Sequence, residues 1–265
     1  MADGDAPIAI ICALEWELAH ARRAVSNVVV DGASTYTVEH ADQPLVLAYS
    51  GMGMVSAAAT AQAVISRYAP RAVLNYGCAG AHRAELLLGD IVVGTRMVAS
   101  DNLSETSDGT YRYKGMHYLV DGQQRRVEVL DADSSLLEAA KRVAEEHVER
   151  HEPWPADLGW PEDVAHRAPR VVFGTVVSAD RWNRSAASIS ALVDRHDSLC
   201  EDMEAAAMAL VCASNGVPFL TIKDISNNEL LRATTGGKAL LEELGTDQIA
   251  RRAAAFTLAV AHTLV

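Results

Sequence analysis

Short apolar runs alternate along the chain with longer segments in which apolar residues recur at helical spacing. Runs rich in Val and Ile and of this length are typical of buried strands, which we expect at 8–12, 45–49, 73–76, 91–98, 171–177 and 219–223. Helical spacing predicts helices at 15–25, 55–68, 134–147, 185–194, 203–215 and 246–264. Pro70 and the pair Asn215-Gly216 follow two of these segments, where helix stop signals are expected.

This alternation of strands and helices predicts an α/β fold with three α/β/α layers around a central, largely parallel (mixed) sheet. A chain of 265 residues fits one such domain, spanning 1–265. One segment, about 101–167, is polar and lacks the pattern of a buried strand. Because long polar insertions are uncommon without a role, we interpret 101–167 as an insertion or lid rather than a second domain.

Composition narrows the possible partners. The formal net charge of −12 argues against a general nucleic-acid or membrane-surface binder, because both of those surfaces are anionic. The four cysteines are widely spaced in apolar surroundings, as expected for buried free thiols in a reducing compartment. The N-terminal segment lacks a basic region and a long apolar run, so we expect no signal peptide, no membrane span and a cytoplasmic protein.

Acidic residues cluster at two places, directly after the first predicted strand and at the start of the helix predicted at 203–215. In open α/β sheets, ligands usually bind beyond the carboxyl ends of the strands. Glu15 and Glu17 come directly after the first strand, and three carboxylates, including Glu204, lie within 201–204 at the start of a predicted helix. A glutamate there can accept hydrogen bonds from two vicinal sugar hydroxyls. The alternative is that these acids only stabilise helix N-termini.

Two glycine-containing turns, at 50–57 and 75–80, allow a ligand to approach the backbone closely. The first superficially resembles a dinucleotide fingerprint. However, no acidic residue occurs between Asp42 and Glu85, so the carboxylate that would hold the ribose of a nicotinamide cofactor is missing. We therefore expect no cofactor, and no motif in the sequence predicts a bound metal.

Two further segments follow strands and contain side chains suited to a flat ligand. Trp182 lies just past the strand at 171–177, where it can stack on a base or pack at a subunit contact. The last strand leads into 224–229, which contains Ser226 and Asn227. Asn is also a common turn residue, so this segment alone decides little.

Taken together, six stretches resemble the purine and uridine nucleoside phosphorylase superfamily, in that family's order. They are IAIICALEWEL, SGMGMVSAAATA, VLNYGCAG with the following GDIVVG, VVSADRW, EDMEAAAMALVCASNGVPF and TIKDISN. The closest branch contains methylthioadenosine/S-adenosylhomocysteine nucleosidase and futalosine hydrolase. The resemblance spans nearly the whole chain except 101–167, and it implies a nucleoside phosphorylase-like domain that forms a homodimer or a higher homo-oligomer.

The resemblance also implies roles for individual residues. Glu17 falls where the nucleosidases keep the glutamate that activates water, and Glu204 falls on the ribose-binding glutamate. The resemblance implies that Met203 lies beneath the sugar and that Trp182 stacks on the base. It places Met52, Cys78 and Ala79 in the pocket wall. Ser226 is expected to bind substrate and to position its neighbour Asn227.

Phosphorylases of the superfamily hold phosphate with arginines in their first glycine loop, which corresponds to 13–17 here, and just before the turn at 75–80. Here those places carry ALEWE and Asn75, so a phosphate dianion would meet carboxylates and no arginine. Hydrolysis is therefore favoured. A phosphorylase that recruits arginines from elsewhere (Arg125, Arg126, Arg181 or Arg184) is an alternative, and a nucleoside-binding protein without turnover is a third.

Asn227 is a departure from the adenine-specific nucleosidases, which have a proton-donating aspartate at this position. An amide cannot give up a proton, but its NH₂ group can donate hydrogen bonds to N7 and O6 of a 6-oxopurine. We therefore predict an N-ribosyl purine nucleoside hydrolase that prefers a 6-oxopurine such as hypoxanthine, with Glu17 and Asn227 as its catalytic residues.

Overall fold

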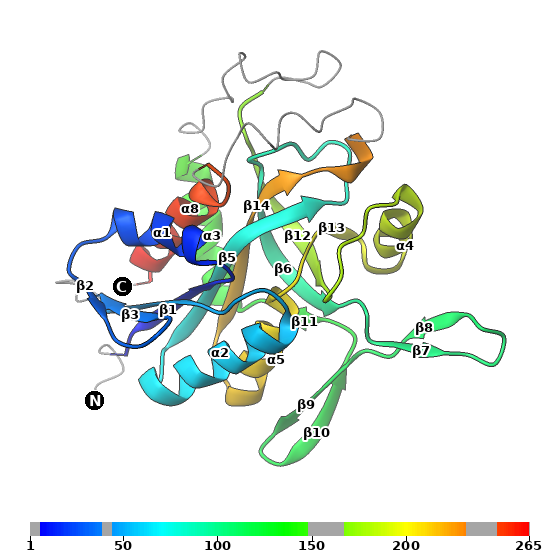
Figure 1. Cartoon of the computed structure of the whole chain (residues 1–265), viewed down its shortest axis with the longest axis horizontal. Coiled ribbons are helices and arrows are strands. Elements are labelled where there is room, and N and C mark those ends of the chain that lie inside the picture. Colours follow the sequence, from blue (N-terminus) through cyan, green and yellow to red (C-terminus); the bar gives the residue numbers. More distant parts are fainter. Residues whose placement is uncertain (1–5, 39–43, 148–166, 232–247, 265) are drawn as a thin grey trace.

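The computed structural model describes residues 6–38, 44–147, 167–231 and 248–264 and shows a mixed α/β domain (Figure 1). Its first half contains β1 (Ile8–Cys12), α1 (Glu15–Ala24), β2 (Val28–Val30), β3 (Thr35–Val38), β4 (Leu45–Tyr49), α2 (Met54–Tyr68), β5 (Ala72–Ala81) and β6 (Ile91–Ala99). The middle contains β7 (Leu103–Glu105), β8 (Tyr111–Tyr113), β9 (Met116–Val120), β10 (Gln123–Val127), β11 (Leu130–Asp131) and α3 (Ser134–His147). The last part contains β12 (Val171–Ser178), α4 (Ala186–His196), β13 (Ser198–Asp202), α5 (Ala205–Asn215), β14 (Phe219–Asn227) and α8 (Arg251–His262).

The central sheet has ten strands and both orientations. The order is β11-β6-β12-β13-β5-β1-β4-β3-β2, and β14 pairs with both β5 and β6. The pairs β1–β4, β1–β5, β5–β14, β6–β12 and β12–β13 are parallel, whereas β14–β6 and β13–β5 are antiparallel. The five strands β5, β14, β6, β12 and β13 consequently form a closed ring of pairings, which brings the ends of distant segments to one place.

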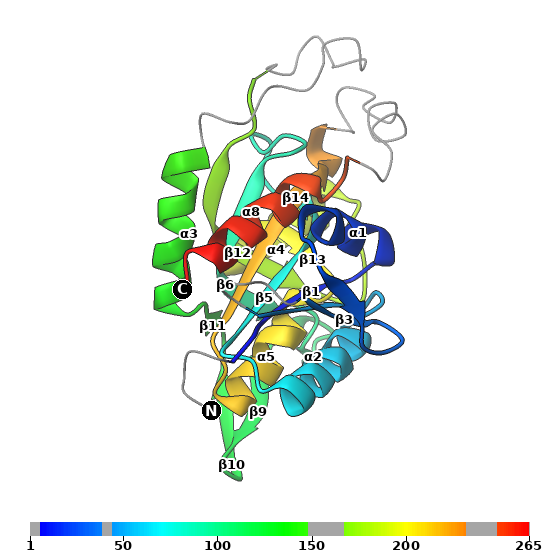
Figure 2. The same cartoon turned by 90° about the vertical axis from the view of Figure 1, so that its left-hand side faces the viewer.

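Helices cover both faces of the sheet (Figure 2). Helices α1, α3 and α8 lie together on one side, and α2 and α5 pack against each other on the other side. All five residues of β1 are buried, as expected for a central strand covered on both faces. Helix α5 is rich in Ala and ends at Gly216, whose left-handed backbone is a common helix stop.

The six predicted strands and six predicted helices are all present, which confirms the predicted three-layer fold class. Residues 246 and 247, at the start of the last predicted helix, lie outside the described residues. Two local predictions were wrong. Residues 75–80 belong to β5, which continues to Ala81, and are not a turn. Residues Glu201 and Asp202 end strand β13, whereas the following helix begins at Ala205 rather than at 203.

The segment 101–147 is more structured than its polar composition suggested. It forms two hairpins, β7–β8 and β9–β10, which extend from the body of the molecule, followed by β11 and α3 (Figure 1). Residues 148–166 lie outside the described residues, so the role of 101–167 as a lid stays a prediction. None of the helices in the described ranges has the length and hydrophobicity needed to cross a membrane.

Candidate active site

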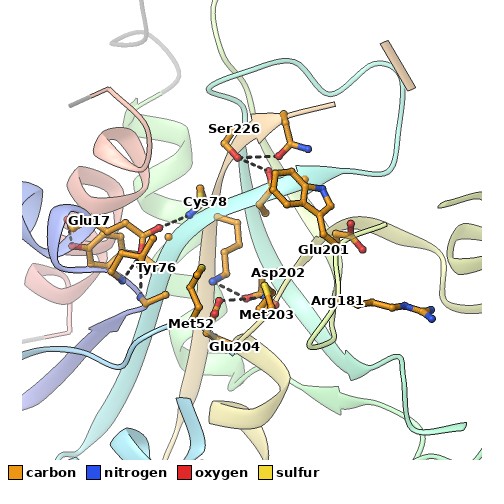
Figure 3. A pocket seen from close by; sticks show the side chains of 18 residues that line it. Glu17, Met52, Tyr76, Cys78, Arg181, Glu201, Asp202, Met203, Glu204 and Ser226 are labelled. Carbon is orange, nitrogen blue, oxygen red and sulfur yellow. Dashed lines mark hydrogen bonds and ion pairs between the residues drawn. The ribbon is translucent and has the colours of Figure 1, made fainter. Parts of the chain in front are cut away.

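A cavity opens at the carboxyl ends of β1, β5, β12, β13 and β14 (Figure 3). The space between its walls, counted out to the open mouth, is about 700 Å³. Every site residue predicted from the sequence lines this one cavity: Glu17, Met52, Cys78, Ala79, Trp182, Met203, Glu204, Ser226 and Asn227. Closure of the sheet explains this convergence, because it brings together segments far apart in the chain.

Glu17 is held in one orientation by three backbone N–H donors. Its Oε2 accepts hydrogen bonds from the N–H groups of Ala13 at 3.1 Å and Leu14 at 3.0 Å, and its Oε1 accepts one from Cys78 at 3.0 Å. A Cβ atom on Gly77 would lie only 2.9 Å from Oε1, so a larger residue there would displace the Glu17 carboxylate. Burial raises the pKa of Glu17 above its ordinary value, and the nearby Lys223 ammonium opposes that shift.

Glu204 connects the start of α5 to the start of α2. Its Oε1 accepts a hydrogen bond from the N–H of Gly53 at 2.8 Å, and Asp180 accepts one from the next N–H, that of Met54, at 2.7 Å. The backbone donors of this glycine turn, which the sequence offered as a ligand site, are therefore bound by the protein's own carboxylates. Burial, together with the charge of Asp202, raises the pKa of Glu204 to about 7.

Lys223 is a fully buried cation that the sequence analysis did not single out. Its Nζ lies 2.7 Å from Oδ2 of Asp202, whose other oxygen, Oδ1, accepts a hydrogen bond from Oγ of Ser178 at 2.5 Å. Burial alone would lower the pKa of Lys223, but the carboxylates of Asp202 and Glu204 raise it above its ordinary value. Lys223 thus keeps its charge and partly compensates the acidic residues around it. A lysine inside the apolar strand FLTIKDISN was the available signal, because a buried lysine requires a partner.

Asn227 lines the cavity and has a buried side-chain donor without a partner among the described residues. The side chain is 5% exposed, and its Oδ1 accepts a hydrogen bond from Oγ of Ser226 at 3.1 Å. Within the described part of the chain, its Nδ2 has no hydrogen-bond partner. Buried amide donors normally find a partner, so an orphaned Nδ2 beside a cavity indicates that a ligand acceptor belongs there.

The mouth of the cavity is apolar. Trp182 is 53% exposed and Met52 is 63% exposed, although both line the cavity. The guanidinium of Arg184 lies 5.2 Å from the centre of the Trp182 ring, in a cation–π arrangement. Large apolar side chains at a mouth are suited to hold a flat, aromatic ligand.

The remaining lining residues were not given a substrate-binding role in the function predicted from the sequence. They are Ala13, Leu14, Tyr76, Gly77, Gly80, Arg181, Glu201, Asp202 and Lys223. Of the arginines considered for phosphate, Arg181 lines the cavity, and Figure 3 shows its side chain directed away from Glu17 and Glu204. Arg125 and Arg126 belong to hairpin strand β10 and do not line the cavity. Within the described ranges, no cluster of acidic, His or Cys side chains is arranged to hold a metal ion.

Comparisons with known proteins agree with this architecture. Residues 7–262 match the family model described as the phosphorylase superfamily. The 5'-methylthioadenosine/S-adenosylhomocysteine nucleosidase of Anoxybacillus flavithermus is 32% identical over 225 residues, which cover 83% of this chain and 84% of that protein.

Solved structures give the same result. The nucleosidase of the same name from Neisseria meningitidis, crystallised with methylthio-immucillin-A, is 27% identical with a TM-score of 0.72 and covers 98% of this chain and 99% of its own. Futalosine hydrolase from Helicobacter pylori, at 20% identity, shares the fold with a TM-score of 0.73 over 97% of this chain and 98% of its own. The chain therefore belongs to the phosphorylase superfamily and resembles its nucleosidase members.

Proposed function

We propose that this protein hydrolyses the N-glycosidic bond of a purine nucleoside, releasing the free base and a ribose derivative, and that it prefers a 6-oxopurine. The observation that carries the proposal is the convergence of Glu17, Glu204 and Asn227 on one cavity. Figure 3 shows Glu17 on one side of this cavity and Ser226 on the other, with Met203 and Glu204 along its lower edge. A nucleoside fits this arrangement, with water at Glu17, ribose at Glu204 and the base toward Asn227.

In the proposed reaction, water attacks C1′ while the bond from C1′ to N9 breaks. Glu17 takes the proton of the attacking water, and the bonding electron pair leaves with the purine. The sugar ring develops oxocarbenium character, as in glycoside hydrolysis generally. Glu204 accepts hydrogen bonds from the 2′ and 3′ hydroxyls, and the Nδ2 group of Asn227 donates to N7 and O6 as charge builds on the base. The departing purine then takes its proton from solvent.

Water is favoured over phosphate because of the charges in the cavity. Glu17, Glu201, Asp202 and Glu204 line it, and Lys223 is already paired with Asp202 at 2.7 Å. The N–H groups of the glycine turn are also occupied by carboxylates. A phosphate dianion at this place would be repelled without a compensating cation.

The proposal is tested with a panel of inosine, guanosine, adenosine, methylthioadenosine and futalosine, each incubated with and without phosphate. We expect free base and a ribose derivative without phosphate, with the largest kcat/KM among the 6-oxopurine nucleosides. Release of ribose 1-phosphate only when phosphate is present would establish a phosphorylase instead. Calorimetric binding of nucleosides without release of base would establish a binding protein.

The pH dependence of hydrolysis follows from the raised pKa values in the cavity. Since Glu17 must be ionised to accept a proton, and Glu204 (pKa about 7) accepts sugar hydroxyls best as a carboxylate, kcat/KM should rise from pH 5 to pH 8. Both carboxyl groups bind protons more tightly in the folded protein than in the unfolded chain. Their contribution to the free energy of unfolding is therefore larger at pH 5 than at pH 8.

Rate profiles of the wild type and of Glu204→Gln check this expectation. The variant should be slower and should lose the part of the profile that titrates near pH 7. A flat wild-type profile between pH 5 and pH 8 would contradict the assignment of these two carboxylates.

We also infer a homo-oligomer in the cytoplasm. Large apolar side chains are exposed, including Met52 and Trp182, which line the cavity, and Val55 (79% exposed), which is close to Met52 in the sequence. Exposed apolar patches of this kind are typical of protein interfaces. Light scattering coupled to size-exclusion chromatography measures the oligomeric state directly.

A further inference from the structure

Asp180 is a carboxylate beside the cavity that the proposed reaction does not use. It lies between β12 and α4, just before Trp182 in the chain, and it does not line the cavity itself. Its Oδ1 accepts a hydrogen bond from the backbone N–H of Met54 at 2.7 Å, although the two residues are 126 positions apart. Asp180 therefore joins the loop that bears Trp182 to the start of α2.

Helix α2 depends on other parts of the chain for its N-terminal cap. The first N–H groups of a helix have no partner within it, and the side chain of the N-cap residue usually accepts one of them. The N-cap residue of α2 is Gly53, which has no side chain and has a φ of 95°, where glycine is favoured. Glu204 and Asp180 replace the missing cap, because they accept hydrogen bonds from the N–H groups of Gly53 and Met54.

The turn and the Asp180 carboxylate pack directly against each other. A Cβ atom on Gly53 would lie 2.9 Å from Oδ1 of Asp180, so a larger residue at this position would push the carboxylate away from α2. Glu204 reaches the same turn from the start of α5, which packs beside α2 (Figure 2). Two consecutive N–H groups are thus divided between two carboxylates that come from different elements.

This division leaves the Glu204 carboxylate with capacity for a ligand. Its Oε1 accepts a hydrogen bond from Gly53, and its Oε2 lies 3.3 Å from the backbone nitrogen of Met203. An ionised carboxylate has about four acceptor sites, so it can still accept two sugar hydroxyls. Without Asp180, the N–H of Met54 would lose its acceptor. The positive end of the helix dipole would then draw Glu204 toward that N–H and away from the sugar.

We propose that Asp180 is a positioning residue, which occupies the N–H of Met54 and thereby keeps the Glu204 carboxylate directed at the 2′ and 3′ hydroxyls of the ribose. This inference rests on the proposed function, because it concerns the sugar contact of the same site. It assigns to Asp180 an effect on sugar specificity, although its own side chain does not reach the cavity.

The alternative role of Asp180 is purely structural, as a cap that stabilises α2. The two roles differ in what they predict for a nucleoside that lacks the 2′ hydroxyl. If Asp180 only stabilises the helix, its substitution weakens the binding of ribonucleosides and 2′-deoxyribonucleosides by a similar factor. If Asp180 positions Glu204, the loss is greater for the ribonucleoside, so the preference for ribose falls.

Calorimetric binding of inosine and 2′-deoxyinosine to the full chain tests the inference. The Glu17→Gln variant serves as the parent, so that hydrolysis is slow during the measurement. We expect the parent to bind inosine at least about 10-fold more tightly, since the deoxynucleoside lacks one hydrogen bond to a charged group. Adding Asp180→Ala should reduce this preference at least about fivefold. Adding Asp180→Asn instead, which retains an oxygen acceptor, should keep the preference within about twofold of the parent.

Asp133→Ala is the matched control for the loss of a helix cap. Asp133 accepts hydrogen bonds from the N–H groups of Ser135 at 2.9 Å and Leu136 at 3.2 Å at the start of α3, and it does not line the active-site cavity. This variant should lower the Tm, as Asp180→Ala does, and leave the preference for inosine unchanged.

A second arm repeats the Asp180→Ala substitution in a chain that also carries Glu204→Gln. The preference for inosine should already be low in that chain, and Asp180→Ala should lower it no further. Absence of a preference in the parent, an equal loss of both affinities in Asp180→Ala, or a further loss in the Glu204→Gln chain would each overturn the inference. Because these assays measure binding, they remain decisive even if the nucleoside panel shows no hydrolysis.

Discussion

Replacing Glu17 with glutamine should lower kcat for nucleoside hydrolysis by about 10²- to 10⁴-fold. Glutamine has the same shape but cannot accept a proton from water at neutral pH. The reaction would retain the sugar and base contacts of Glu204 and Asn227, so KM should change much less than kcat. Release of free base, measured with saturating nucleoside, gives the effect directly.

The fold should survive this substitution at a measurable cost. The new NH₂ group would face either the N–H of Cys78 alone or the N–H groups of both Ala13 and Leu14, instead of an oxygen. An unpaired buried donor costs about 1–3 kcal/mol, so the variant should show a native circular dichroism spectrum with a lower Tm.

Glu15→Gln is the matched control, because Glu15 opens the same helix but is exposed. It should leave kcat within about twofold, as expected for a surface substitution away from the site. If Glu17→Gln retained activity within threefold of the wild type, Glu17 would not be the general base.

The local sequence was sufficient to predict elements that are buried and regular. Strand β1 (IAIIC) is the clearest case, because a short uninterrupted apolar run that is rich in Ile is typical of a buried strand. The exposed hairpin strand β10 (QQRRV) was missed for the opposite reason. Four of its five residues are exposed, and its pairing with β9 depends on a partner that the local pattern does not reveal.

Errors near the cavity have a different physical cause. Segments 77–80 and 224–227 carry glycines and polar residues that resemble loops, yet they are the ends of two long strands that pair with each other. Glycine is needed there because side chains approach the strand closely, as Glu17 does at Gly77. Polar residues are tolerated because they face the cavity or pair with each other, as Lys223 does with Asp202.

The sequence motifs nevertheless identified one set of residues that lines a single cavity. Each motif follows a strand, and the carboxyl ends of parallel strands meet at one edge of a sheet. What the motifs did not reveal was the electrostatic balance of that edge. Lys223 becomes visible as a site residue, paired with Asp202, only when the curled sheet brings β13 and β14 together through β5.

Asn227→Asp should reduce the preference for 6-oxopurine over 6-aminopurine nucleosides by at least about 100-fold, as the ratio of kcat/KM values. The substitution replaces the orphaned Nδ2 donor with an oxygen. When ionised, that oxygen would repel O6 of the base. When protonated, it can give its proton to N7 of an adenine, which Asn227 cannot do. The first effect lowers kcat/KM for 6-oxopurine nucleosides and the second raises kcat/KM for 6-aminopurine nucleosides. Both effects therefore lower the ratio of the two kcat/KM values.

Asn228→Asp separates this effect from a general disturbance of the segment. The amide of Asn228 donates to the carbonyl oxygens of Arg83 at 2.9 Å and Leu86 at 2.8 Å, and it does not line the cavity. The same chemical change one residue further on should therefore cost stability and leave the ratio of the two bases unchanged. Both variants are compared on nucleoside pairs that share one 5′ substituent, so that only the base differs. An unchanged ratio in Asn227→Asp would mean that this amide does not read position 6, and the predicted preference for a 6-oxopurine would lose its main physical basis.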